Sequence, residues 1–351
     1  MKVLLLGGYG FIGCVLSTYL HERGDEVTVL DTLLFEQDED VDVPGEFIRG
    51  DIRSINDFLA ALAEADAVVN LAAISNDPAS DLLPELTWEI NYKANETIAQ
   101  LCQATGKRVV YASSCSVYGF SNDEVFTESS RIGPVTLYAQ TKMLSEHLYL
   151  HESIDSVVLR FATVYGFSPK TRFDLVVNTM IGSGLFQGKI FVNGGSQWRP
   201  VVHVKDVAQA IYLALHAENP KHRVYNVGSN EQNYQISTLG EIVTKELANV
   251  ESVHLEDSLD QRSYNVDFSL IKRDLGFEAE YTVADAVAEL RDVVENGMLI
   301  SMEDEVYYRV KYLKNLYADS ELLNSSPYRN YFLPLRYAMV GHYGDLGANG
   351  H

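Results

Sequence analysis

The sequence predicts a doubly wound α/β protein: a parallel (Rossmann) sheet with helices on both faces, and a smaller mixed α/β lobe that binds substrate. In the first half, apolar β-rich runs alternate with helical patterns, which is typical of parallel βαβ units. A glycine-rich turn joins the first run to the first helical pattern. Beyond Gly166 the alternation loosens into mixed polar and aromatic segments. The length of 351 residues is sufficient for two lobes.

The elements of the first half have recognisable starts and stops. Strands are expected where apolar and β-branched residues run together, at 2–8, 26–31, 46–51, 67–73, 108–114 and 156–166. Helical patterns lie between them, at 11–24, 54–65, 84–106 and from about Tyr138. Ser54 is the expected N-cap of one helix, and Gly24 and Gly106 end two others. The acidic stretch 35–46, with Pro44 and Gly45, predicts a solvated loop.

The second half divides less clearly. Residues 204–216 predict a helix and 223–229 a short strand. We expect the sheet domain to span 1–166, with segments near 203–229 returning to it, and the substrate lobe to span 167–300. Residues 301–351 form an extension that holds 8 of the 21 tyrosines. The extension could cover the active site or form an interface, but wrapping the second lobe is the default expectation.

Charge limits the classes of partner. Lys and Arg total 27 against 49 Asp and Glu, so the formal net charge is -22 and the pI is about 4.7. Such a field repels nucleic acid and anionic membranes. An anionic small ligand therefore requires a local cluster of arginines.

Cysteine content and hydropathy favour a cytoplasmic protein. Cys14, Cys102 and Cys115 are too few and too scattered for a disulfide framework or a four-ligand zinc site, and we expect no metal. No apolar run reaches the roughly 20 residues that span a bilayer.

Gly7, Gly10 and Gly13 predict a dinucleotide site, because they lie between the first strand and the first helix. Glycine permits the tight turn and the close approach of a diphosphate to the backbone, while the helix N-terminus offers free N–H groups. Phe11 and Ile12 complete this turn.

Carboxylates at two strand ends extend the dinucleotide site. Asp31 ends the second strand, 18 residues after Gly13, near the spacing at which a carboxylate binds the adenosine ribose. Because no Arg or Lys occurs from Thr32 to Phe47, a 2′-phosphate would be repelled, and NAD is favoured over NADP. Asp51 is a weaker candidate for the adenine, and a solvated turn residue is an equal alternative.

Tyr138 and Lys142 predict general-base chemistry. Their i, i+4 spacing puts both on one helix face, just after the fifth strand. A nearby ammonium lowers the pKa of a phenol, so Tyr138 could accept an alcohol proton. Ser114, at the end of that strand, could hydrogen-bond the reacting oxygen and the phenolate.

These motifs together resemble the extended short-chain dehydrogenase/reductases of the nucleotide-sugar epimerase and dehydratase family. The resemblance runs from Met1 to about Asn296. The matching residues, in family order, are Gly7, Gly10, Gly13, Asp31, Asp51-Ile52, Leu71-Ala72-Ala73, Ser114, Tyr138, Lys142, the segment 159–166, the segment 197–208 and Arg262.

The resemblance implies a shared first step, in which Tyr138 removes a sugar hydroxyl proton while hydride passes to NAD. It implies that Lys142 also holds the nicotinamide ribose, that Ser114 is the catalytic hydroxyl, and that the chain dimerises. Arg199 and Arg262 resemble the residues that clamp the diphosphate of a nucleotide-diphosphate sugar. The remaining residues expected near the substrate are Ser116, Thr163, Arg172 and Asn178.

Two positions after Ser114 narrow the reaction. Family dehydratases carry an Asp-Glu pair there, whereas this chain has Cys115 and Ser116, which supply no easy acid/base chemistry. Reversible oxidation at one carbon is the most economical alternative, and C4 epimerisation through a 4-keto sugar is the leading hypothesis. A one-way 4-dehydrogenase or 4-ketoreductase is second, a 4,6-dehydratase third, and a non-enzymatic NAD-binding protein last.

At two positions the sequence departs from the family, which limits what the resemblance implies about the substrate site. Thr163 stands where many relatives carry Asn, and Asn70 where many carry His. The sugar pocket could therefore differ from that of ordinary UDP-glucose 4-epimerases. His203 is interpreted as a structural residue.

Overall fold

The computed structural model describes residues 1–35, 43–121, 124–255 and 263–318. Its centre is a seven-stranded parallel sheet of order β11-β7-β5-β4-β1-β2-β3, which confirms the predicted doubly wound fold. The bounds are β1 Lys2–Leu6, β2 Glu26–Asp31, β3 Glu46–Arg49, β4 Ala67–Asn70, β5 Arg108–Ser114, β7 Ser156–Phe161 and β11 Val224–Val227.

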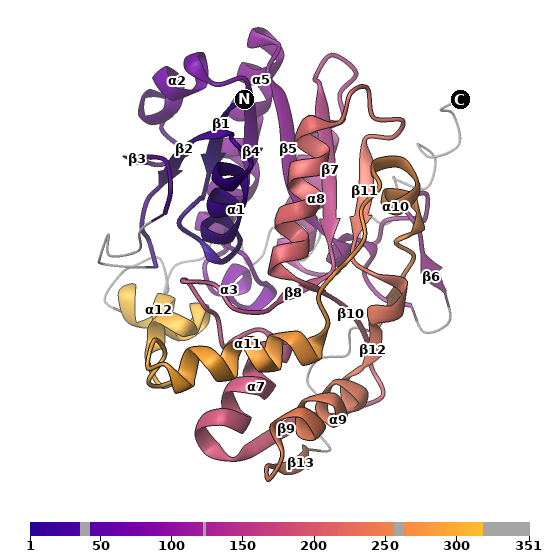
Figure 1. The fold of residues 1–351 in the computed structure, drawn as a ribbon. Helices are drawn as coiled ribbons and strands as arrows, with labels where there is room; N and C mark the ends of the chain where they lie inside the picture. The colour runs from indigo at the N-terminus through magenta and orange to yellow at the C-terminus, as the bar shows by residue number, and fades with distance from the viewer. Residues whose placement is uncertain (36–42, 122–123, 256–262, 319–351) are drawn as a thin grey trace.

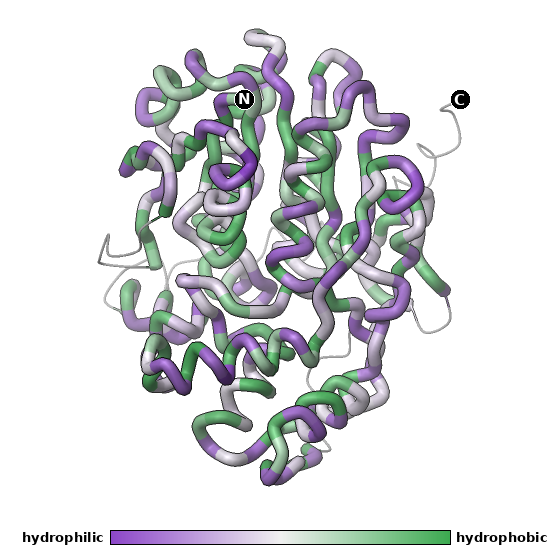
Figure 2. The backbone as a smooth tube through the Cα atoms, viewed as in Figure 1, coloured by the Kyte–Doolittle hydropathy of each residue, from purple (hydrophilic) through white to green (hydrophobic). Residues whose placement is uncertain are grey.

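Helices cover both faces of this sheet (Figure 1). On one face lie α1 (Phe11–Glu22) and α8 (Val204–His216), and on the other α2 (Ile55–Glu64), α5 (Ala94–Thr105) and α6 (Leu137–Tyr149). Strand alternation separates the two cores: Val3 and Leu5 pack with the first group, and Leu4 and Leu6 with the second. The near-continuous apolar strands therefore reflect burial on both faces (Figure 2).

The helix expected at 84–106 contains a π-helical turn. Helix α4 (Pro84–Trp88) passes through this turn at Glu89–Lys93 into α5, which ends at Gly106 in the left-handed region. The side-chain amide of Asn91, in the turn, accepts the Ile74 N–H and donates to the Ile74 carbonyl. The Asn91 backbone carbonyl accepts a hydrogen bond from the Ser145 hydroxyl of α6. The turn therefore fastens the loop after β4 to α6.

The single strand expected at 156–166 is two strands. β7 ends at Phe161 in the main sheet, and β8 (Thr163–Tyr165) belongs to a three-stranded sheet with β10 (Trp198–His203) and β12 (Asn233–Gln235). The apolar pattern continues across Ala162 because β7 is buried throughout and Tyr165 at the end of β8 is buried as well. This crossover carries the chain from the sheet domain into the second lobe.

The second lobe has its own apolar core. Its other elements are α7 (Val176–Gln187), β9 (Lys189–Asn193), α9 (Ile236–Leu247), β13 (Glu251–Leu255) and α11 (Val283–Glu295). The short strands β6 (Val125–Phe126) and β14 (Asn265–Val266) pair with each other, and α10 (Ser269–Leu275) packs near β11. α8 and β11, which follow part of this lobe in sequence, pack on α1 and pair with β7.

The C-terminal segment lies partly on the sheet domain. Its described part contains a short turn at Glu305–Tyr307 and α12 (Arg309–Leu316). Tyr307 packs on Phe173 of the second lobe, whereas Leu313 packs in a cluster with Ile74 and Leu83. Up to residue 318 the segment therefore contacts the second lobe, as the default expectation has it, and also the sheet domain; 319–351 lie outside the described residues.

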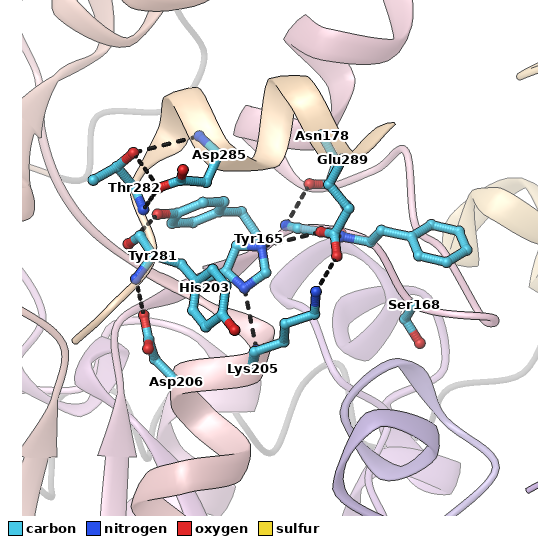
Figure 3. Close-up of polar contacts among 12 residues, drawn as sticks. Tyr165, Ser168, Asn178, His203, Lys205, Asp206, Tyr281, Thr282, Asp285 and Glu289 are labelled. Atoms are coloured by element: carbon cyan, nitrogen blue, oxygen red, sulfur yellow. Dashed lines mark hydrogen bonds and ion pairs between the residues drawn. The ribbon is translucent and has the colours of Figure 1, made fainter. Parts of the chain in front are cut away.

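A polar cluster joins the two lobes (Figure 3). His203 accepts the Lys205 N–H at 3.2 Å, its Nε2 lies 3.2 Å from Glu289 of α11, and its ring stacks on Tyr281. Gly166 (φ +106°) approaches so closely that an added Cβ would lie 2.3 Å from the His203 ring. His203 thus has the structural role expected of it.

Glu289 provides a stability test of this junction. Burial raises the pKa of Glu289, but its bonds to His203 and Lys205 outweigh this and hold the pKa at about 2. Because the folded-state pKa is depressed, its contribution is fully present above the ordinary value of 4.5 and is lost as pH falls toward 2. We expect Glu289→Gln to lower the free energy of unfolding by about 2 kcal/mol at pH 7, with the difference shrinking between pH 5 and pH 3.

Urea denaturation at several pH values measures this difference. Glu278→Gln, which removes an exposed carboxylate paired with Lys272, is the matched control and should change little. A Glu289→Gln deficit that is constant with pH would show that the charge is not responsible.

Candidate active site

A cavity of about 610 Å³ lies at the carboxyl ends of the sheet strands, between the sheet domain and the second lobe. It brings together most of the residues singled out in the sequence. Those lining it are Gly7, Gly10, Phe11, Ile12, Gly13, Asp31, Asp51, Ile52, Leu71, Ala72, Ala73, Ser114, Ser116, Tyr138, Thr163, Arg172 and Arg199.

The glycine turn fits a dinucleotide diphosphate. Gly7 (φ +79°) packs so closely on the segment after β4 that an added Cβ would lie 2.7 Å from the Ala72 backbone. Gly10 precedes α1, and no described side chain caps the first N–H groups of that helix. These groups therefore remain available to an anion in the cavity.

The two acidic strand ends differ. Asp31 accepts the N–H groups of Tyr9 at 3.0 Å and Leu33 at 2.9 Å, while burial raises its pKa above the ordinary range. Asp51 binds Arg53 with an N–O distance of 2.5 Å. Although burial raises the pKa of Asp51, these bonds outweigh it, and the pKa lies below the ordinary range. Because Asp51 is already paired with Arg53, Asp31 is the better candidate to bind the adenosine ribose.

Tyr138 and Ser114 form the chemical centre of the cavity. Thr136 caps α6 by accepting the Ala139 N–H, which places Tyr138 in the first turn beside the end of β5. The Ser114 hydroxyl accepts the Ser116 N–H at 3.2 Å, and its interaction with the Tyr138 phenol lowers the pKa of that phenol. A substrate alcohol in the cavity could reach this hydroxyl pair.

Lys142 lies on the same helix face but is directed at the backbone. Its Nζ donates to the Ala112 carbonyl at 2.6 Å and lies 5.7 Å from the centre of the Tyr138 ring. Burial lowers the pKa of Lys142 to about 7. Lys142 does not line the cavity described above.

The acidity of Tyr138 differs from the sequence expectation. Burial raises the pKa of its phenol above 10 and the Asp77 carboxylate raises it further, while Ser114 and Arg172 act in the opposite direction. The expected lowering by Lys142 is not seen: Ser114 and Arg172 are the groups that lower the pKa, and burial of the half-buried phenol dominates. The protein alone therefore favours the neutral phenol.

A buried ion pair supports the catalytic elements. Arg160 of β7 donates to both oxygens of Glu146 in α6, at 2.9 and 2.6 Å, and Ser113 of β5 donates to the same carboxylate. Arg160 and Glu146 are each 2% exposed. Sequence reasoning missed this pair: Arg160 lies in the matched segment 159–166 without a role of its own, and Glu146 belongs to no motif.

The residues after Ser114 face in different directions. The Ser116 hydroxyl lines the cavity and has no hydrogen-bond partner among the described residues. Cys115 is fully buried, and its sulfur donates to the Arg160 carbonyl at 3.2 Å. Cys115 is therefore a packing residue, and Ser116 is available to a ligand.

The three arginines predicted to bind substrate have different positions. Arg199 lines the cavity beside Tyr264, whose ring centre is 5.3 Å from the guanidinium carbon. Arg172 is bound to Asp174 through two hydrogen bonds and to Ser75, so it connects the lobes. Arg262 lies outside the described residues.

Asn178 does not reach the cavity. It is fully buried, and its amide binds both the N–H and the carbonyl of Gly166 at 2.9 Å. The expectation that it contacts substrate is therefore not supported, because its hydrogen-bonding groups are already used. Asn70 is likewise buried and bonded to Asn95 and Tyr149.

The structure also brings forward residues that sequence reasoning missed. Asp77 and Asn76 line the cavity after β4, and the Thr136 hydroxyl donates to Asp77 at 2.5 Å. Asn76 caps the short helix α3 (Asp77–Leu82), a start that the Asn-Asp-Pro sequence signals. Arg309 of α12 also lines the cavity, but no motif near it in the sequence marks this role.

Comparisons with known proteins agree with the fold described above. Residues 3–228 match a family model described as the NAD dependent epimerase/dehydratase family. A UDP-glucose 4-epimerase of Lactobacillus helveticus is 29% identical over 65% of this chain and 77% of its own length.

Two solved structures show how widely the fold is shared. MoeE5 in complex with UDP-glucuronic acid and NAD has a TM-score of 0.74 and 27% identity, covering 85% of this chain and all of that one. DesIV of Streptomyces venezuelae, a dTDP-glucose 4,6-dehydratase, has a TM-score of 0.71 and 26% identity, covering 84% and 98%. The fold is therefore common to more than one sugar-nucleotide reaction.

The Arg160–Glu146 pair provides a second stability test. Glu146→Gln leaves a buried guanidinium without its counter-charge, so we expect the free energy of unfolding to fall by about 3 kcal/mol. Glu96→Gln removes an exposed carboxylate paired with Lys93 and should change it by less than about 0.5 kcal/mol. Equal effects of the two substitutions in urea denaturation would contradict this account.

Proposed function

The chain belongs to the NAD dependent epimerase/dehydratase family, and we propose that it is a nucleotide-sugar epimerase acting at C4 through a 4-keto intermediate. It is an NAD-dependent enzyme of nucleotide sugars. The observation that carries the proposal is the Tyr138–Ser114 hydroxyl pair, followed in the cavity by the Ser116 hydroxyl where family dehydratases carry an acid.

The chain's own residues would perform the proton transfer. Tyr138 accepts the proton of the sugar O4 hydroxyl, and Ser114 donates a hydrogen bond to the oxygen on which negative charge develops. NAD, when bound, supplies the hydride-transfer chemistry. Because burial raises the pKa of the Tyr138 phenol, a cationic neighbour is needed to favour its deprotonation; Arg172 already acts in that direction, and Lys142 is the lysine on the same helix face.

The cofactor would be held by the sheet domain. Asp31 would accept hydrogen bonds from the adenosine ribose, and the glycine turn with the start of α1 would bind the diphosphate. To bind the nicotinamide ribose, Lys142 would exchange its hydrogen bond to the Ala112 carbonyl for one to the ribose. The backbone of Leu71, Ala72 and Ala73 would line the inner wall.

The substrate would lie toward the second lobe. Arg199 would bind the sugar-nucleotide diphosphate, with Arg262 as its partner from outside the described residues. Ser116 and Thr163 line the same cavity as Arg199 and Tyr138, and we assign them to binding the sugar. A buried hydroxyl that is left unpaired by the protein, as in Ser116, favours a polar ligand.

Two further reactions would use the same centre. A one-way 4-dehydrogenase or 4-ketoreductase needs no change in these residues. A 4,6-dehydratase needs a second acid/base group, and Asp77 is a carboxylate that lines the cavity and raises the Tyr138 pKa. Asp77 is the specific observation that keeps the dehydratase as an alternative.

Substrate profiling separates the three reactions. The purified protein would be incubated with UDP-, GDP-, dTDP- and CDP-sugars, and the products followed by NMR and by absorbance at the NADH band. An epimer with no net NADH is expected. Stoichiometric NADH would indicate a redox enzyme, and a stable 4-keto-6-deoxy sugar would overturn the argument from Cys115 and Ser116.

Tyr138→Phe tests the proposed base. Without a proton acceptor the turnover number should fall by roughly 10³-fold, in the upper range of general-base effects, while NAD remains bound. Tyr111→Phe is the matched control, since Tyr111 is also buried but does not line the cavity, and should retain activity within about twofold. Full activity of Tyr138→Phe would remove Tyr138 from this role.

We also propose a cytoplasmic homodimer. Among the described residues no helix is long and apolar enough to span a bilayer. Sedimentation equilibrium would measure the oligomeric state, and a monomer at micromolar concentration would refute the dimer.

A further inference from the structure

Helix α12 contributes to the cofactor half of the cavity, although it lies outside the segment that matches the family model. Figure 1 shows α12 at the end of the sheet where the parallel strands finish. Leu313 anchors it in the cluster with Ile74 and Leu83, and Tyr312 packs on Phe35 after β2. The first residues of the helix, Arg309 and Val310, then line the same cavity as Asp31.

The Arg309 side chain has too few partners for its position. Arg309 is 5% exposed, yet its guanidinium makes one long hydrogen bond, at 3.4 Å to the Val306 carbonyl, and no ion pair among the described residues. Its carbon lies 4.0 Å from the centre of the Phe35 ring. Asp174, an acidic neighbour of Arg309, accepts the Arg309 backbone N–H and binds Arg172 with both oxygens.

Burying a guanidinium without a counter-charge is unfavourable. Burial and the nearby Arg172 charge lower the pKa of Arg309 to about 9, so the group still carries its proton at neutral pH. The apolar contacts of Leu313 and Tyr312, rather than the charge, hold the helix in place. An anion in the cavity would supply the missing partner.

The surroundings indicate which anion. Arg309 acts electrostatically on Asp31, and Lys170 acts on both Asp31 and Cys14, which is in the first turns of α1. Of these two cations, Arg309 lines the cavity and Lys170 does not, so Arg309 is the one placed to reach a cofactor diphosphate beside Asp31. A 2′-phosphate is a poor match, because the Asp31 carboxylate would repel it. The substrate diphosphate is assigned to Arg199.

We propose that Arg309 is a further cofactor-binding residue, which donates hydrogen bonds to the diphosphate of NAD and thereby lets α12 retain the dinucleotide. This inference rests on the NAD site described above and extends it to the C-terminal segment. Its chemistry is that of guanidinium with phosphate oxygens, which adds to the N–H groups at the start of α1.

Calorimetric titration of the full-length, cofactor-free protein tests the inference without reference to turnover. Arg309→Gln should weaken binding of NAD and of ADP-ribose by the same factor, on the order of 10- to 100-fold. Binding of UDP should be unchanged, because the substrate diphosphate does not depend on Arg309. Lys314→Gln, which removes the same charge from an exposed position of α12, should leave all three affinities unchanged.

Thermal unfolding supplies the readout that a merely structural arginine would alter. Cofactor-free Arg309→Gln should melt at or above the wild-type temperature, because an incompletely paired buried cation has been removed, whereas saturating NAD should raise its melting temperature less than that of wild type. A lower melting temperature without cofactor, together with unchanged NAD affinity, would make Arg309 structural.

Three further outcomes would overturn the inference, and one would support it while refuting the proposed function. If Arg309→Gln weakened NADP but not NAD, the arginine would serve a 2′-phosphate, and if it weakened only UDP it would serve the substrate. Unchanged NAD affinity with normal epimerase activity would refute the role of Arg309 and leave the proposed function intact. Weakened binding of NAD and ADP-ribose by Arg309→Gln, together with a wild-type protein that has no epimerase activity, would support the role of Arg309 and refute the proposed function.

Discussion

The buried ion pair between Arg160 and Glu146 is the interaction on which the active-site geometry depends. It joins β7 to α6, and through Ser113 it also binds the end of β5. These elements carry or adjoin Ser114, Tyr138 and Lys142. Because both charges are out of water, the pair tolerates no loss of either partner. The precision of the hydroxyl pair in the cavity thus derives from a polar contact in the core behind it.

The sequence predicts well what depends on neighbouring residues. The glycine turn, the alternation of strands and the spacing of Tyr138 and Lys142 are local patterns, and each takes the expected form. The split of 156–166 could not be predicted, since β7 and β8 share one apolar pattern while pairing in different sheets. Asn178 fits a substrate motif equally well until its amide is seen to bind Gly166.

The positions of charged residues in the fold were also not predictable from neighbouring residues in the sequence. The absence of Arg and Lys from Thr32 to Phe47 predicted that nothing offsets the repulsion of a 2′-phosphate by Asp31, yet the fold brings Arg309 and Lys170 within electrostatic range of Asp31 from distant segments. Likewise a protein of net charge -22 can hold anionic ligands, because a few buried cations act over short distances in a cavity while the acidic surface is screened by solvent. Net charge therefore excludes extended polyanions more securely than small ones.

The wall formed by α12 has a consequence for the order of folding. The glycine turn and Arg309 lie at opposite ends of the described chain, whereas each βαβ unit is assembled from near neighbours in sequence. Contacts between residues so far apart in sequence form late, after the local units have folded, because closing a long loop costs conformational entropy. The sheet domain can thus be largely formed while its dinucleotide site is still open on one side. Competence to retain a cofactor is consequently acquired in the last stage of folding, later than competence to form the sheet.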